Sequence, residues 1–295
     1  MYLRTSIEFV TEDNCVLRGW LYVPKDKPVS PGIIMSHGFS ALKEHFLSQF
    51  AEVFVEAGMC VLVYDNRHFG ASDGDVRFEV DPVLQVRDMR DAITFMQSLP
   101  QVDAKKIGLW GTSFSGGNVL TLAATDKRPA CAVVQVPFVS GHHHYLQSKK
   151  PDLWEIIQKK YAADRQARAA GKPPAMTPVV TKDPEKSAVM KQPEAYQFFT
   201  SVPEWQNQVT LKSLENSGEY YPTNMVANIS PMPLLFIIAD QDTVCPTNLA
   251  LAAYEKAGQP KECVMVQGEH FAPYHEQFAI CSEAACQWFK KYLLE

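Results

Sequence analysis

The sequence lacks long hydrophobic runs and an export signal. No apolar segment approaches the roughly 20 residues that a helix needs to cross a bilayer. The first residues, from Met1 to Glu8, carry a charge of each sign and have no apolar core of a signal peptide. These absences argue against a membrane partner, and we expect a soluble cytoplasmic protein.

An excess of positive charge and a disulfide framework are also missing. The 28 lysines and arginines are outnumbered by 33 aspartates and glutamates, so the net charge is −5. No basic patch stands out, which excludes nucleic acid as an expected partner. Seven cysteines are an odd number, and several lie inside apolar runs. They predict buried thiols in a reducing compartment rather than disulfides.

No pattern of metal ligands is present. The three consecutive histidines, His142 to His144, do not share a helix face as ligands at i and i+4 do. No nearby cysteine or carboxylate pattern joins them. We therefore expect no metal, and we assign these histidines a structural role.

What the chain does contain is an alternation of strands and helices. Two alternating runs, 3–10 and 16–23, predict an opening hairpin. Short apolar runs that predict strands then occur at 32–36, 59–64, 106–110, 131–136, 234–239 and 262–266, with helical spacing between most of them. This order predicts an α/β domain with a mainly parallel sheet flanked by helices on both faces.

The most informative motif is KIGLWGTSFSGG at residues 106–117. An apolar run ends at Gly111, Ser113 follows two residues later, and small residues open a helix. This is the layout of a nucleophile elbow, which holds an exposed serine in a strained turn. The usual G-x-S-x-G pattern has Ser115 as its last residue here, where a small side chain still lets helix and strand approach. A glycine- and serine-rich turn without catalysis is the alternative interpretation.

An acid and a histidine follow in the order that the elbow requires, serine, acid, histidine. Asp242 and His270 each come after one of the last two predicted strands. His270 would take the proton of Ser113, and Asp242 would fix the imidazole tautomer. We prefer Asp242 to Asp240, because the loop can carry the later residue toward the histidine. Asp240 is expected to shape the turn.

Two backbone N–H groups are expected to bind the oxyanion. One belongs to Phe114, the residue after the serine, and the other to Phe39, in the loop after an early strand. Backbone donors suit this role because they are fixed before charge develops. His37 is the wrong histidine for catalysis, and we expect it to bond the backbone of this loop.

Residues 138–230 interrupt the alternation. We interpret them as a helical lid inserted into a core formed by 1–137 and 231–295, because so long a departure within a compact domain is usually functional. The lid would fold over the strand ends and shape an apolar pocket. Phe138 and Trp154 are our candidates for substrate binding.

Three more residues near the site are given structural roles. Asp65 and Arg67, in a turn-rich loop, are expected to form a buried pair that braces the site. Cys245, three residues after the proposed acid, is expected to be a packed thiol.

Together these motifs resemble α/β-hydrolase-fold serine hydrolases over nearly the whole chain outside the lid. The resemblance rests on 37–39, 65–74, 111–117, 242–246 and 270–271. The elbow and the run VQVPFVSG at 134–141 are similar to the dienelactone-hydrolase-like branch, which includes polyketide transferases and thiohydrolases. Asn118 departs from the pattern of that branch, because many of its members carry a histidine at this position. The resemblance implies acyl transfer through a serine ester to water or an alcohol, with no cofactor.

We therefore expect a serine hydrolase that cleaves an ester or thioester of a medium-sized apolar acyl group, free or bound to a carrier protein. One alternative is a polyketide acyltransferase, thiohydrolase or cyclase that passes the acyl group to an alcohol. Another is a non-catalytic ligand-binding protein on the same fold. A peptidase is weaker, because no acidic cluster for an amino terminus can be identified. A homodimer is left open.

Overall fold

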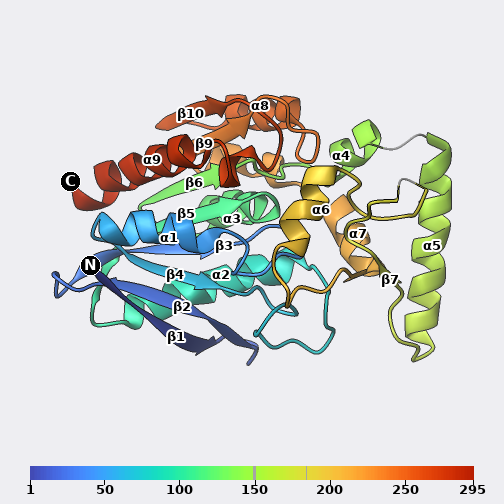
Figure 1. Ribbon diagram of the computed structural model, residues 1–295, viewed down its shortest axis with the longest axis horizontal. Helices are drawn as coiled ribbons and strands as arrows, with labels where there is room; N and C mark the ends of the chain where they lie inside the picture. Colours follow the sequence, from blue (N-terminus) through green and yellow to red (C-terminus); the bar gives the residue numbers. More distant parts are fainter. Residues whose placement is uncertain (149–150, 184) are drawn as a thin grey trace.

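The centre of the protein is an eight-stranded sheet, seen in a computed structural model that describes residues 1–148, 151–183 and 185–295 (Figure 1). Its strands follow the order β1-β2-β4-β3-β5-β6-β9-β10. β1 and β2 form an antiparallel hairpin, β2 is antiparallel to β4, and the remaining pairs are parallel. The strands are β1 (Tyr2–Val10), β2 (Val16–Pro24), β3 (Ser30–Ser36), β4 (Cys60–Tyr64), β5 (Val102–Thr112), β6 (Cys131–Gln135), β9 (Leu234–Ala239) and β10 (Lys261–Val266).

Helices cover both faces of this sheet. One core layer joins the strands to α1 (Leu47–Glu56) and α9 (Phe278–Phe289). The other joins them to α2 (Pro82–Ser98), α3 (Phe114–Thr125) and α8 (Thr247–Lys256). The predicted α/β-hydrolase architecture is therefore confirmed. Within the described residues, no helix is long and apolar enough to cross a membrane.

Local sequence signals explain where these elements form. β4 is a continuous apolar run whose five residues are all buried, as a parallel strand covered on both faces requires. α2 begins where the Asp81 carboxylate accepts hydrogen bonds from the N–H groups of Val83 and Leu84, with Pro82 in the first turn. Because the strands from β4 to β10 pair in parallel, their carboxyl ends and the loops after them lie at one edge of the sheet.

The segment 138–230 is inserted between β6 and β9, which are neighbours in the sheet. It contains α4 (Gly141–Ser148), α5 (Pro151–Ala169), β7 (Met176–Thr177), α6 (Pro193–Thr200), β8 (Val209–Thr210), α7 (Leu211–Gly218), η1 (Pro222–Asn224) and η2 (Val226–Asn228). Two further short elements are η3 (Ala272–Tyr274) and η4 (Lys290–Leu294). Figure 1 shows α4 to α7 gathered at one end of the sheet, with α5 outermost. Residues 149, 150 and 184 of the segment lie outside the described part.

Candidate active site

Ser113 occupies the sharp turn between β5 and α3. Its backbone is left-handed, with φ 55° and ψ −122°, a conformation that costs a residue with a side chain about 1–3 kcal/mol. Two backbone hydrogen bonds hold it: Ser113 N–H donates to Gln135 O (2.8 Å), and Phe138 N–H donates to Ser113 O (2.9 Å). A Cβ on Gly111 would lie 2.2 Å from the carbonyl oxygen of Ser115, so only glycine fits before the turn. The turn therefore has the geometry of a nucleophile elbow.

Asp242 and His270 meet Ser113 in a continuous hydrogen-bonded chain. His270 Nε2 lies 2.9 Å from Ser113 Oγ, and His270 Nδ1 lies 2.7 Å from Asp242 Oδ2. The other carboxylate oxygen, Oδ1, accepts the N–H groups of Val244 (2.8 Å) and Cys245 (2.7 Å). A carboxylate only accepts, so Nδ1 carries the imidazole proton and Nε2 is left to accept from the serine hydroxyl.

Asp240 takes no part in this chain. Its Oδ1 accepts the N–H of Gly268 at 2.8 Å, which links the loop after β9 to the loop after β10. The structure thus brings Asp242 to the histidine and places Asp240 in the turn.

The loop after β3 lies directly against the elbow. A Cβ on Gly38 would be 2.9 Å from Ser113 Cβ and 3.3 Å from its Oγ. The rings of Phe39 and Phe114 lie edge to face, with centroids 5.7 Å apart. Phe114 is the first residue of α3, where backbone N–H groups have no partner within the helix. The two amides expected to bind an oxyanion therefore belong to residues that flank the serine.

His37 connects this loop to its neighbour, and its hydrogen-bond partners are Gly38 and Asn66 rather than members of the proton chain. Its Nε2 accepts the N–H of Asn66 (3.0 Å), and its Nδ1 donates to Gly38 O (3.0 Å). Burial lowers the pKa of His37 below its ordinary value, which keeps the ring neutral in this arrangement. The ring orients the Gly38 peptide, and so the Phe39 amide that follows.

A buried polar network underlies the elbow. The hydroxyl of Ser115 lies 3.0 Å from that of Ser36, which donates to Asn66 Oδ1 at 3.0 Å. Asn118 Nδ2 donates to Gln85 Oε1 (3.0 Å) and Ser115 Oγ (3.3 Å). The serine at the last elbow position and the asparagine at 118 thus link α3 to the strand that leads into the oxyanion loop.

His45 joins the same loop to the inserted segment. Its Nδ1 accepts the N–H of Leu42 (3.0 Å), and its Nε2 donates to Phe199 O, in α6, at 3.1 Å. Phe198 stacks on the imidazole, with ring centroids 5.2 Å apart. Burial lowers the pKa of His45 to about 4, so the ring stays neutral at physiological pH.

The expected pairing of two bracing residues is corrected. Asp65 and Arg67 do not pair with each other. Asp65 binds Lys43 Nζ at 2.7 Å, whereas Arg67 Nε binds Asp88 at 2.7 Å and Arg67 Nη1 binds Asp13 at 2.8 Å. Their side chains reach different elements, so Asp65 braces the oxyanion loop and Arg67 braces α2 and the β1–β2 turn.

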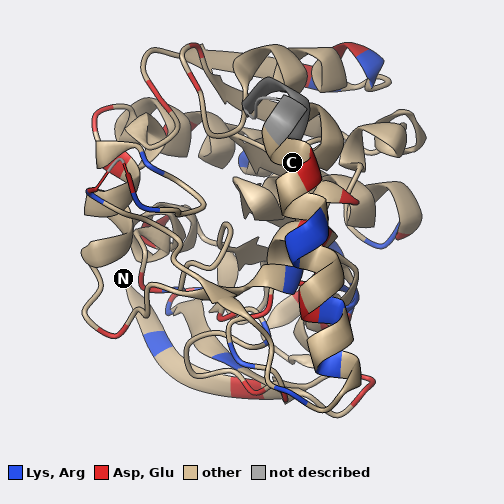
Figure 2. Ribbon diagram, turned by 90° about the vertical axis from the view of Figure 1, so that its right-hand side faces the viewer, with Lys and Arg blue, Asp and Glu red and all other residues tan. Residues whose placement is uncertain are grey.

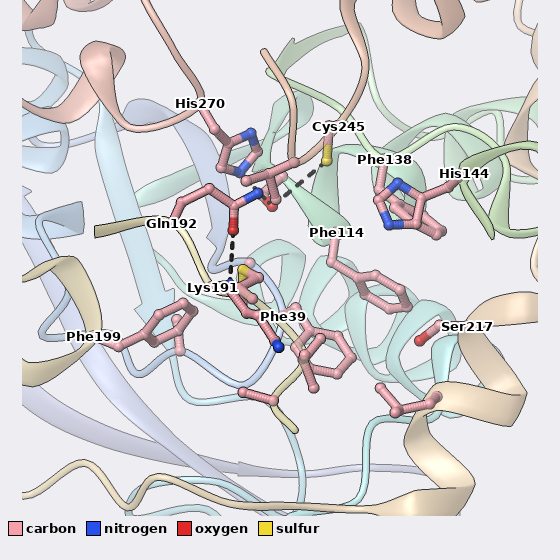
Figure 3. A pocket seen from close by; sticks show the side chains of 18 of the residues that line it. Phe39, Phe114, Phe138, His144, Lys191, Gln192, Phe199, Ser217, Cys245 and His270 are labelled. Carbon is pink, nitrogen blue, oxygen red and sulfur yellow. Dashed lines mark hydrogen bonds between the residues drawn. The ribbon is translucent and has the colours of Figure 1, made fainter. Parts of the chain in front are cut away.

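A cavity of about 810 Å³ opens on Ser113 and His270 (Figure 3). Its wall near the serine is largely aromatic and aliphatic. It includes Phe39, Phe114, Phe138, Phe199, Leu211 and Phe271. Phe138 lies on this wall, and its role in substrate binding stays a prediction.

Trp154 does not line this cavity, contrary to our expectation. The α5 residues that line it are Leu153, Ile156, Ile157, Lys160 and Tyr161, which follow i, i+3, i+4 spacing. Trp154 stands three residues before Ile157 and seven before Tyr161, at the edge of this stripe, and its indole lies beside the His142 ring, with centroids 6.3 Å apart. A side chain at the edge of a helix face can turn to either side, and that of Trp154, 38% exposed, lies against α4 instead of lining the pocket.

Cys245 is closer to the site than the sequence indicated. Its Sγ lies 4.0 Å from Ser113 Oγ and lines the cavity (Figure 3). Burial, with a contribution from the charge of Asp242, raises the pKa of this thiol well above its ordinary value, so it is protonated at neutral pH. Its amide bonds the proposed acid, and this three-residue spacing is the signal that could have placed it here.

Comparisons with known proteins agree with this architecture. The family model described as X-Pro dipeptidyl-peptidase (S15 family) matches residues 13–272. A thiohydrolase of Eupenicillium brefeldianum is 31% identical over 274 residues, which cover 90% of this chain and 86% of the relative. Polyketide transferase grgF of Penicillium sp is 32% identical over 271 residues, 90% of this chain and 88% of the relative.

A solved structure extends the likeness to three dimensions. The crystal structure of alpha/beta hydrolase GrgF from Penicillium sp. sh18 matches with a TM-score of 0.87 and 29% identity, over 99% of this chain and all of the other. With the relatives above, it identifies an enzyme that acts on ester or thioester bonds as a hydrolase or an acyltransferase. The chain belongs to the family described as X-Pro dipeptidyl-peptidase (S15), on an α/β-hydrolase fold that it shares with fungal thiohydrolases and polyketide transferases.

Proposed function

We propose that this enzyme transfers a medium-sized apolar acyl group through an ester on Ser113. The observation that carries the proposal is the hydrogen-bonded chain from Ser113 through His270 to Asp242. A serine hydroxyl is a weak nucleophile unless a base removes its proton as it attacks. His270 Nε2 is placed to accept that proton, and the imidazolium that forms is stabilised by Asp242.

The proposed reaction has two halves. Ser113 Oγ bonds to the carbonyl carbon while its proton passes to His270, and the leaving thiol or alcohol departs with that proton. An acceptor, water or an alcohol, then gives its proton to His270 and attacks the acyl ester, which frees Ser113. In each half the amides of Phe39 and Phe114 would stabilise the oxyanion, and losing one such donor typically costs about 10²–10³ in rate.

The cavity supports an apolar acyl group as the substrate. Phe114, Phe138 and Leu211 provide carbon surface, and each buried methylene contributes about 0.8 kcal/mol. The substrate would be a small acyl compound, either free or presented by a carrier protein. All seven cysteines are free thiols, which supports our proposal of a cytoplasmic location.

Release of dipeptides from the amino terminus of a peptide, which the family name describes, is disfavoured by the charges of the pocket. An exopeptidase that releases dipeptides must hold a protonated amino terminus, which calls for acidic groups. Among the described residues that line the cavity there is no aspartate or glutamate, whereas Lys160 and Lys191 are present. These cations would repel an ammonium group.

Transfer to an alcohol is the second candidate, supported by relatives named polyketide transferases and by the apolar surroundings of the serine. A site that excludes water protects the acyl ester from hydrolysis. Product analysis with and without an acceptor alcohol separates the two outcomes. Free acid as the sole product in both conditions rejects the transferase.

The proposed function is tested with Ser113→Ala. The wild-type enzyme should turn over p-nitrophenyl esters and N-acetylcysteamine thioesters of medium-chain acids, and a fluorophosphonate should label it covalently. The variant should fold and lose both properties. Turnover or labelling that persists in Ser113→Ala would reject the serine as the nucleophile.

A further inference from the structure

One cation lies on the pocket-facing side of α5 where the pattern calls for an apolar residue. Leu153, Ile156, Ile157 and Tyr161 form a stripe at i, i+3, i+4 and i+8 that lines the cavity. Lys160 occupies the i+7 position of that stripe and lines the same cavity. Lys160 is exposed, so its side chain borders both the cavity and the solvent.

Lys160 is not neutralised by its own helix. No carboxylate of the described residues lies within ion-pair distance of its ammonium group. The acid one turn later, Asp164, is held by Arg168 Nε (2.8 Å) and by the N–H of Ala175 (2.7 Å). On the other face of the helix, by contrast, Lys159 pairs with Glu155 at 2.6 Å. Figure 2, which faces this end of the molecule, shows the charged bands along α5.

Among the described residues that line the cavity, lysine is the one charged type besides histidine. Lys191, in the segment before α6, is a second cation in the lining, and the described lining residues include no acid (Figure 3). Leu153 and Ile156 remain 44% and 50% exposed, so this side of the cavity is open to a ligand that would cover them. Apolar surface with an unneutralised ammonium at its edge suits an amphiphilic anion.

We propose that Lys160 selects substrates that carry an anionic group, a carboxylate or a phosphate, remote from the scissile carbonyl. The inference rests on the proposed function, since it assigns the substrate class of the same pocket. In this arrangement the apolar part of the substrate lies against the aromatic wall near Ser113, and the anion lies beside α5. The anion belongs either to the leaving group or to the far end of the acyl chain.

Two pairs of thioesters distinguish these sources. Octanoyl-coenzyme A and octanoyl-N-acetylcysteamine share the acyl group and differ in the charge of the leaving group. The N-acetylcysteamine thioesters of octanoic acid and of its ω-carboxylate share the leaving group and differ in the charge of the acyl end. In one of the two pairs, the wild-type enzyme should have a lower KM for the anionic member, and added salt should reduce the difference.

The variants are Lys160→Met and Lys160→Arg, with Lys159→Met as the matched control on the opposite face. Lys160→Met should raise KM for the preferred anionic substrate by roughly 2- to 5-fold, and it should change KM for the neutral partner less. Lys160→Arg should keep the preference, and so should Lys159→Met. A wild-type enzyme without preference in either pair overturns the proposal. So does a Lys160→Met variant that affects both members equally.

A binding measurement separates this proposal from the proposed function. In the Ser113→Ala background, the Kd of octanoyl-coenzyme A and of the ω-carboxylate thioester can be measured by calorimetry without turnover. Adding Lys160→Met should weaken binding of the preferred anion by the same factor. If Ser113→Ala stays active while the charge preference holds, only the assigned nucleophile is wrong. If turnover is lost but the Kd is insensitive to Lys160, only this inference is wrong.

Discussion

Replacing Asp242 with asparagine should abolish most activity while preserving the fold. The position accepts three hydrogen bonds, from the amides of Val244 and Cys245 at one oxygen and from His270 Nδ1 at the other. An asparagine has a single oxygen and an NH₂ group that only donates. The amide of the variant therefore has two possible orientations, with its oxygen toward His270 or toward the two backbone amides.

The hydrogen-bond donors around the side chain determine which orientation is more stable. If the oxygen faces His270, the NH₂ group meets two backbone donors, and leaving each buried donor unpaired costs about 1–3 kcal/mol. If the oxygen faces the two amides, both bonds are kept, and the NH₂ group donates to His270 Nδ1. The second arrangement is favoured by roughly 2–6 kcal/mol, since two donors are at stake. It forces the imidazole proton onto Nε2, which can then no longer accept the proton of Ser113.

We expect kcat of Asp242→Asn to fall by about 10⁴-fold, which is about 5.5 kcal/mol of transition-state free energy. Stopped or continuous p-nitrophenyl ester assays measure this, with circular dichroism and thermal unfolding to verify folding. Asp240→Asn is the matched control, because it changes the neighbouring strand-end acid, and it should keep kcat near wild type. A folded Asp242→Asn enzyme with more than a tenth of wild-type kcat would refute the tautomer reasoning.

Three further predictions follow from the same site. Gly38→Ala puts a methyl group 2.9 Å from Ser113 Cβ, which should displace the loop that carries the Phe39 amide. We expect kcat to fall by about 10²–10³ at a nearly constant melting temperature. An unchanged kcat would mean that the loop accommodates the methyl group. Cys245→Ala should remain active, and iodoacetamide at pH 7 should modify the wild-type thiol slowly, because its pKa is raised; inactivation by the substitution would contradict the first point, and rapid alkylation the second. The pKa of His45 is lowered to about 4 in the folded protein. As the pH falls below 6.5, the imidazole is therefore protonated in the unfolded chain before it is protonated in the folded one. The free energy of unfolding should decrease between pH 6.5 and pH 4 by up to about 1.4 kcal/mol per pH unit. Urea unfolding of His45→Gln should show a shallower loss over this range, and identical slopes would reject the assignment.

Much of the site is predictable from sequence because each part is encoded locally. Ser113, Asp242 and His270 each follow an apolar strand, and parallel strands bring their carboxyl ends to one edge. The order of the motifs along the chain then restricts the roles that each residue can play. This is why the predicted strands, and the meeting of these three side chains, agree with the structure.

The misassigned residues depend on information that local sequence does not contain. Trp154 lies at the edge of the pocket-facing side of α5, and the direction in which its indole turns is decided by its contact with His142 in α4. The partners of Asp65 and Arg67 are set by which elements pack beside their loop, since Lys43 and Asp88 come from different elements. The contacts of these side chains are therefore determined by long-range packing rather than by residue type.

The place of the inserted segment has a consequence for how such enzymes diversify. Because β6 and β9 are hydrogen-bonded neighbours, the chain leaves and re-enters the sheet at adjacent positions. Ser113 precedes the insertion, whereas Asp242 and His270 follow it. The residues of the hydrogen-bonded chain are therefore encoded outside the insertion, whereas part of the pocket wall is encoded within it. Recombination or drift across codons 138–230 can change which substrates the pocket binds, while Ser113, Asp242 and His270 are inherited unchanged.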